Sequence, residues 1–137
     1  MFIDTLIEKE GCQPEIIFLF GFSTGACLDM ELGLDRFVRG KRALGGAVCI
    51  AGGCIEQNKN DSANSKASEQ TPVLIVGGSK DETFPPTAVK NAVETYNEVN
   101  SNTIPASVHI KEGKGHAMVQ SPEEMEAVMK FFSRITW

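Results

Sequence analysis

Apolar and polar positions fall along the chain in blocks that predict four strands and four helices. The strands are short apolar runs rich in Ile, Val, Leu and Phe, expected at residues 16–20, 44–51, 72–77 and 106–111. The helices have apolar residues three or four positions apart and are expected at about 2–10, 24–38, 86–99 and 122–135. Ser121-Pro122-Glu123-Glu124 is a capping box with proline at the first helical position, which marks the start of the last helix.

The order of these elements favours an α/β fold. Strands are mostly followed by helices, which favours a mostly parallel sheet of about four strands with helices on its faces. The runs 44–51 and 72–77 are apolar throughout, as in strands buried on both faces, whereas 106–111 alternates and is expected near a sheet edge. We expect one domain over residues 1–137.

Residues 56–70 interrupt this pattern with a run that contains almost no apolar side chain. The composition predicts a flexible, solvated loop. A loop of this length is either an insertion or a lid over a site. An insertion is favoured, because a lid would need apolar residues to cover a substrate.

Composition and charge argue against several classes of partner. The net charge is −5 and no basic stripe is present, which disfavours nucleic acid and anionic membrane surfaces. No apolar run approaches the roughly 18–20 residues of a membrane span. The first ten residues carry three carboxylates and no basic region, so no secretory signal is expected and we predict a cytoplasmic location.

The four cysteines give no sign of a metal or a cofactor. Their spacing matches neither a zinc site nor a C-x-x-C motif, and an intracellular location disfavours a disulfide (Cys12, Cys27, Cys49 and Cys54). We expect Cys27 and Cys49 to be buried thiols. No cofactor and no metal site are predicted.

The first strand runs into Gly21-Phe22-Ser23-Thr24-Gly25, a Gly-x-Ser-x-Gly sequence that a helix follows. This strand–turn–helix context favours a nucleophile elbow, in which the serine adopts a strained positive φ and its hydroxyl projects above the sheet. Side chains at Gly21 and Gly25 are expected to collide with neighbouring elements. The alternative is an ordinary glycine-rich turn with a bystander serine.

A serine hydroxyl needs a base, and the base needs a third group to hold it. His116 follows the strand at 106–111, and Asp81 follows the strand at 72–77, so both are expected at the edge of the sheet where Ser23 lies. The other histidine, His109, lies within a strand and is expected to be a bystander. Asp29 and Asp35, on the helix after Ser23, are expected to be solvated. The order Ser…Asp…His is that of α/β-hydrolases.

Three blocks carry a family resemblance: Gly21-Phe-Ser-Thr-Gly-Ala26, Gly77-Gly-Ser-Lys-Asp81 with Pro85, and Gly113-Lys-Gly-His116. They resemble the catalytic blocks of the α/β-hydrolase superfamily, most of all the phospholipase/carboxylesterase branch that contains the acyl-protein thioesterases. The fungal serine-hydrolase branch is nearly as similar. The resemblance implies a serine hydrolase of carboxylic esters or thioesters, with an acyl ester or thioester as substrate. Thr24 replaces the branch's usual glutamine, and its backbone N–H would serve the oxyanion hole.

The resemblance covers the chain but only the C-terminal part of the family fold. The family's first four strands and the loop that gives a second oxyanion donor have no counterpart here. Loss of one such donor lowers the rate on the order of 10²–10³-fold. The strand at 16–20 would also lack its usual neighbour, which predicts self-association or pairing with an N-terminal segment.

Two further functions stay open from the sequence. The first is a catalytically impaired, truncated module that acts through the open edge of the strand at 16–20. The second is a nucleotide-binding, flavodoxin-like domain, which fits the alternation of strands and helices but lacks a phosphate-binding glycine-rich loop unless Gly21 to Gly25 serve as one.

Overall fold

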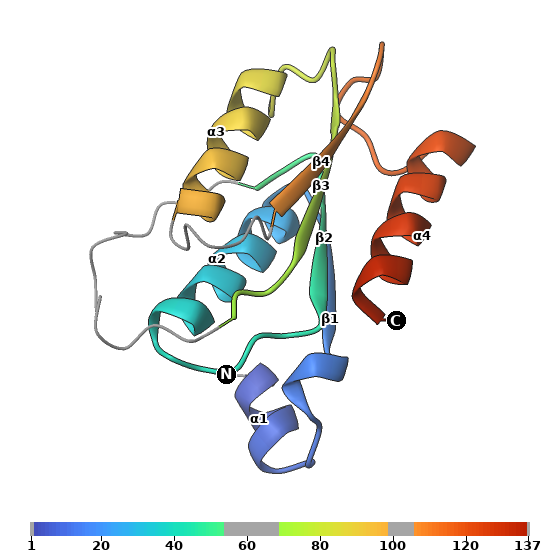
Figure 1. The fold of residues 1–137 in the computed structure, drawn as a ribbon. Helices are drawn as coiled ribbons and strands as arrows, with labels where there is room; N and C mark the ends of the chain where they lie inside the picture. Colours follow the sequence, from blue (N-terminus) through green and yellow to red (C-terminus); the bar gives the residue numbers. More distant parts are fainter. Residues whose placement is uncertain (1, 54–68, 99–105, 137) are drawn as a thin grey trace.

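A computed structural model describes residues 2–53, 69–98 and 106–136 (Figure 1). The elements follow the predicted order, with one added 3₁₀ turn at Pro14–Ile16. The helices are α1 (Phe2–Glu8), α2 (Thr24–Val38), α3 (Pro86–Glu98) and α4 (Pro122–Thr136). The strands are β1 (Phe18–Phe22), β2 (Gly46–Ile50), β3 (Val73–Gly78) and β4 (Ala106–Lys111).

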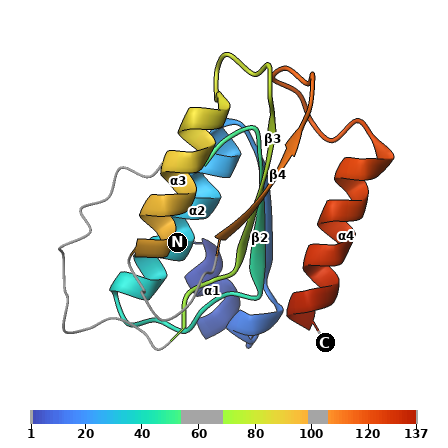
Figure 2. The ribbon, with the colours of Figure 1, turned by 45° about the horizontal axis from the view of Figure 1, so that its top comes forward.

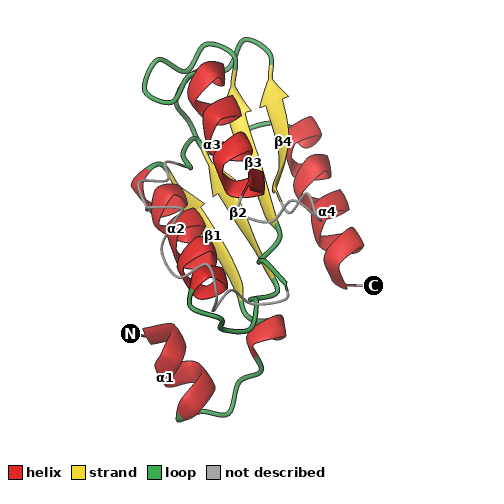
Figure 3. Ribbon diagram, turned by 60° about the vertical axis from the view of Figure 1, so that its left-hand side comes forward, coloured by secondary structure: helices red, strands yellow, loops and turns green. Residues whose placement is uncertain are grey.

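The four strands form one parallel sheet in the order β1-β2-β3-β4 (Figure 3). β2 and β3 occupy the centre and are buried along their whole length, as their continuous apolar runs predict. β4 lies at one edge, which confirms its predicted place. The α/β class and the parallel sheet are therefore as the sequence indicates.

Helices cover both faces of the sheet, with α2 and α3 on one side and α4 on the other (Figures 1 and 2). The α2–α3 side contains the larger apolar cluster, which includes Met30, Leu34, Ile75 and Tyr96. The α4 side contains a smaller cluster around Val48, Leu74, Val128 and Phe131. The carboxyl ends of all four strands point to the same end of the molecule, where the loops after β3 and β4 lie together (Figure 1).

The first strand begins later than predicted and occupies the other edge of the sheet. Ile16 belongs to the 3₁₀ turn, where the N–H of Ile17 donates to the carbonyl of Pro14 at 3.0 Å, so β1 starts only at Phe18. In the described part of the chain no strand pairs with the outer edge of β1. Phe18, Phe20 and Phe22 are 39, 53 and 38% exposed.

Most of the predicted loop at 56–70 lies outside the described residues. Of its two described residues, Glu69 is exposed but Gln70 is buried and donates from Nε2 to the carbonyl of Tyr96 at 2.9 Å. The prediction of a solvated loop is therefore wrong at Gln70. Within the described residues, no helix is long and apolar enough to cross a membrane.

The described cysteines Cys12, Cys27 and Cys49 are free thiols. Cys49 is buried, as predicted, and burial raises the pKa of its thiol well above the usual value. Cys27 is only half-buried, so its predicted burial is wrong in degree. Cys54 lies outside the described residues.

Candidate active site

Ser23 occupies the turn between β1 and α2 with a left-handed backbone, at φ 56° and ψ −112°. Such a conformation strains a residue with a side chain and persists only where its surroundings hold it. The N–H of Ser23 donates to the carbonyl of Ile50 at 2.8 Å. The carbonyl of Ser23 accepts from the N–H groups of Ala26 and Cys27 at 3.1 and 3.2 Å. The backbone is thus fixed on both sides at the carboxyl end of the sheet.

The two glycines of the motif differ in what surrounds them. A Cβ on Gly21 would lie 2.5 Å from the carbonyl carbon of Gly25, so a side chain there collides as predicted. A Cβ on Gly25 would meet nothing within 4 Å among the described residues, and the prediction of a collision at Gly25 is wrong. Close approach of strand and helix requires glycine only at Gly21, because the first turn of α2 faces open space at Gly25.

The structure brings Ser23, His116 and Asp81 into one chain of hydrogen bonds. Nε2 of His116 lies 3.0 Å from Oγ of Ser23, and Nδ1 lies 2.9 Å from Oδ2 of Asp81. Each residue follows a different parallel strand: β1, β4 and β3. The imidazole also lies beside the ring of Phe22, with ring centroids 5.2 Å apart.

Asp81 is held as a carboxylate. Its side chain is fully buried, and Oδ1 accepts the N–H groups of Thr83 and Phe84 at 2.8 and 2.9 Å. Burial alone would raise the pKa of Asp81, but the hydrogen bonds from Phe84, His116 and Thr83, together with the charge of a protonated His116, outweigh it and lower the pKa. With Oδ2 accepting from Nδ1–H, Nε2 of His116 is left to accept the Ser23 hydroxyl proton.

A cavity of about 490 Å³ opens beside the serine. Thr24 lines it as the first residue of α2, where the N–H has no carbonyl of a preceding turn to bond. The walls come from α2, the end of β2, the loop after β3 and α3, including Cys27, Ala51, Phe84, Ala88 and Ala92. Nothing in the sequence pattern singles out Phe84 or Cys27 as pocket residues, because their place follows only from how α2, α3 and the loop after β3 surround the cavity.

Asp29 and Asp35, expected to be solvated, and His109, expected to be a bystander, differ in their surroundings. Asp29 is only 8% exposed, so its predicted solvation is wrong, and Oδ2 has no hydrogen-bond partner among the described residues. Asp35 is half-buried and paired with Arg39 at 2.7 Å. His109 is half-buried on β4 and takes no part in the chain of hydrogen bonds at Ser23.

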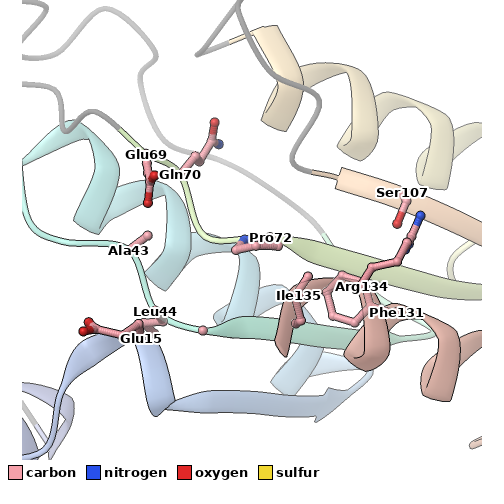
Figure 4. A pocket seen from close by; sticks show the side chains of 11 residues that line it. Glu15, Ala43, Leu44, Glu69, Gln70, Pro72, Ser107, Phe131, Arg134 and Ile135 are labelled. Carbon is pink, nitrogen blue, oxygen red and sulfur yellow. The ribbon is translucent and has the colours of Figure 1, made fainter. Parts of the chain in front are cut away.

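A second cavity, of about 450 Å³, lies at the opposite end of the sheet (Figure 4). Its lining comes from the amino ends of the strands and from α4: Leu44, Pro72, Ser107, Phe131 and Ile135 are among the residues shown. The strand length separates it from Ser23, so it does not belong to the hydrogen-bonded set.

The fold and the strand-end site define the class of protein as an α/β-hydrolase. Residues 1–136 match the family model described as Phospholipase/Carboxylesterase. The chain therefore belongs to the phospholipase/carboxylesterase family, the first of the two branches that the sequence resembles.

Individual proteins agree with this assignment. The chain is 30% identical to acyl-protein thioesterase 1 of Kluyveromyces lactis over 139 residues, which cover 96% of this chain and 57% of that protein. A phospholipase/carboxylesterase from Dyadobacter fermentans superposes with a TM-score of 0.68 at 29% identity, covering 96% of this chain and 59% of that one. SOBER1 of Arabidopsis thaliana shares the fold, with a TM-score of 0.73 at 24% identity over 99% of this chain and 60% of that one. The chain thus spans less than two thirds of the length of these relatives.

Proposed function

We propose that this chain carries the catalytic residues of a serine hydrolase that cleaves carboxylic ester or thioester bonds. The proposal rests on one observation above all. Oγ of Ser23, in a left-handed backbone at the start of α2, lies 3.0 Å from Nε2 of His116, whose Nδ1 lies 2.9 Å from Asp81. Membership of the phospholipase/carboxylesterase family supports it.

In the acylation step, Oγ of Ser23 attacks the carbonyl carbon as Nε2 of His116 takes the hydroxyl proton. Asp81 stabilises the imidazolium that forms and holds the ring by its hydrogen bond to Nδ1. The tetrahedral intermediate collapses and expels the alcohol or thiol, which receives the proton from His116. The acyl group remains on Ser23.

In the deacylation step, His116 takes a proton from water, and the resulting hydroxide attacks the acyl carbon. Collapse releases the carboxylic acid and returns the proton to Oγ of Ser23. In both steps the N–H of Thr24 would donate to the oxyanion, at a helix N-terminus whose dipole favours negative charge. The family's second oxyanion donor comes from a loop that has no counterpart among these residues, so we assign the oxyanion to Thr24 alone.

The cavity of about 490 Å³ beside Ser23 would receive the acyl part of the substrate. Phe84, Ala88 and Ala92 supply apolar surface, and the opening lies next to the hydroxyl. The name of the Kluyveromyces lactis relative, acyl-protein thioesterase 1, supports thioesters as the substrate class. We retain the cytoplasmic location as a prediction.

Fluorophosphonate labelling tests the proposal, because the probe forms a covalent bond only with an activated serine. Wild-type chain should be labelled, and Ser23→Ala should not. Ser107→Ala is the matched control, since Ser107 lines the cavity at the opposite end of the sheet. Absence of Ser23-dependent labelling, in the chain alone and with any N-terminal partner segment added, would refute the hydrolase.

A second candidate function is association through the open edge of β1. The specific observation is the row formed by Phe18, Phe20 and Phe22 on an edge strand, exposed by 39, 53 and 38%. Such an edge pairs readily with another strand. The chain would then act by self-association, or by pairing with an N-terminal segment, without turnover. A monomeric chain with full esterase activity would exclude this function.

A further inference from the structure

The loop that carries His116 contains a buried ion pair that the proposed reaction does not use. Lys114 lies two residues before His116, and its Nζ pairs with the carboxylate of Glu124 in the first turn of α4. The two side chains are only 5 and 1% exposed. A charge this deeply buried is costly unless it is paired, so each residue fixes the place of the other.

The Glu124 end of this pair is itself locked. Oε1 of Glu124 accepts the N–H of Gln120 at 3.1 Å and the hydroxyl of Ser121 at 3.0 Å, while Oγ of Ser121 accepts the N–H of Glu124 at 3.3 Å. Burial alone would raise the pKa of Glu124, but hydrogen bonds from Lys114, Gln120 and Ser121 outweigh it and lower the pKa. The capping box of α4 therefore serves as a rigid anchor for Lys114.

The backbone of the same loop is joined to the loop that carries Asp81. The N–H of Lys80 donates to the carbonyl of Lys114 at 2.9 Å, and the N–H of Gly113 donates to Oγ of Ser79 at 2.6 Å. Lys114 thus contacts the aspartate loop through its backbone and α4 through its side chain. Both contacts lie just before His116, which is otherwise exposed.

We propose that Lys114 and Glu124 are positioning residues for His116: the buried pair fixes the histidine loop against α4, so that the imidazole bridges Asp81 and Ser23. The expected effect of the pair on the reaction rests on the proposed hydrolase function. The expected effect of the pair on the position of His116 rests on the contacts above. A second ion pair between the end of β4 and the first turn of α4 offers a natural comparison. Lys111 and Glu123 also pair, at 2.6 Å, but they are 30 and 67% exposed, and a surface pair contributes little.

The first readout is the rate at which Ser23 reacts with a fluorophosphonate probe. Glu124→Gln and Lys114→Met should each slow labelling by about 10–100-fold, the cost of a misplaced catalytic group. The control Glu123→Gln should stay within about 2-fold of wild type. Folding of every variant is checked by far-UV circular dichroism. The double variant Lys114→Met/Glu124→Gln leaves no buried ion unpaired and keeps the acceptor of the cap, so it serves if the single variants fail to fold.

The second readout is the low-field proton resonance of Nδ1–H of His116, assigned by its loss in Asp81→Asn. It should be present in wild type and in Glu123→Gln, and lost or broadened in the folded pair variants. If the folded pair variants react with the probe at the wild-type rate and keep an unchanged resonance, the inference is overturned. It is also overturned if the resonance is absent from wild type. If wild type shows the resonance but no labelling of Ser23, the hydrolase proposal fails, and loss of the resonance in the pair variants still supports positioning.

Discussion

The carboxyl group of Asp29 packs against the α-carbon of Gly21, two residues before Ser23. A Cβ on Gly21 would lie 2.6 Å from Oδ2 of Asp29, as well as 2.5 Å from the carbonyl group of Gly25. The helix that begins at the elbow therefore lies against the strand that leads into it, with the carboxyl group in the space that a side chain would fill. Two predictions concern this contact.

Position 21 should not tolerate a side chain, whereas position 25 should tolerate one. Gly21→Ala is expected to lower the free energy of unfolding by about 2–3 kcal/mol, because the methyl group must displace backbone atoms. Gly25→Ala lies in the first turn of α2 with open space around it, and is expected to be neutral or to stabilise by up to about 1 kcal/mol. Urea denaturation of the two variants checks this, and equal losses at both positions would contradict it.

The second prediction concerns pH. Burial raises the pKa of Asp29 to about 7, against roughly 3.9 in an unfolded chain. Between pH 4 and 7 the unfolded chain has released this proton while the folded chain still binds it, so stability falls as pH rises through this range. Asp29→Asn removes the effect. The difference in unfolding free energy between wild type and Asp29→Asn should change by on the order of 3 kcal/mol between pH 4 and pH 8.

The matched control is Asp35→Asn on the same helix, where the carboxylate is half-buried and paired with Arg39 at 2.7 Å. It is measured over the same pH range, so that the effect of Asp29 can be separated from the loss of any one carboxylate from α2. Curves for wild type and Asp29→Asn that run parallel from pH 4 to 8 would show that Asp29 ionises normally in the folded chain.

The surroundings of Asp29 show which features of the fold could be predicted from the sequence and which could not. The order of elements and the parallel sheet follow from apolar periodicity and glycine positions, because continuous runs such as 44–51 can only be buried. A helical count from the elbow predicts that Asp29 points away from Ser23, and its expected solvation follows from that direction alone. In the structure Asp29 lies on the buried stripe of α2 with Ala26, Met30 and Leu34, and its carboxyl group lies against Gly21 of β1.

The candidate site also has one part that the sequence predicts and another that it does not. Ser23, Asp81 and His116 could be found because parallel strands deliver their carboxyl ends to one edge. The pair of Lys114 and Glu124 joins a loop to a helix cap ten residues away, and each half has an ordinary local explanation in the sequence. Only the packing of α4 against the sheet shows that the two motifs meet.

Replacing the carboxylate that holds the imidazole should disable Ser23 without unfolding the chain. Asp81→Asn keeps the size of the side chain but favours the wrong tautomer of His116, so labelling of Ser23 by a fluorophosphonate should fall on the order of 10³–10⁴-fold. Glu82→Gln is the control, because Glu82 is the exposed neighbour of Asp81. A labelling rate for Asp81→Asn within about 10-fold of wild type would show that Asp81 does not act on the serine through His116.

The open edge of β1 should govern the state of association of the chain. Phe20 lies in the middle of the strand, is 53% exposed, and belongs to the edge that no described strand pairs with. Sedimentation velocity of wild type should show association that increases with concentration.

Phe20→Lys places a charge on this edge and should shift the chain to monomer, since a lysine on an edge strand opposes pairing. The control Leu28→Lys alters an equally exposed apolar residue, which is 54% exposed and belongs to α2 rather than to β1, and should leave association unchanged. If wild type sediments as a monomer at every concentration, the edge does not mediate self-association. If Leu28→Lys dissociates the chain and Phe20→Lys does not, the contact lies on α2.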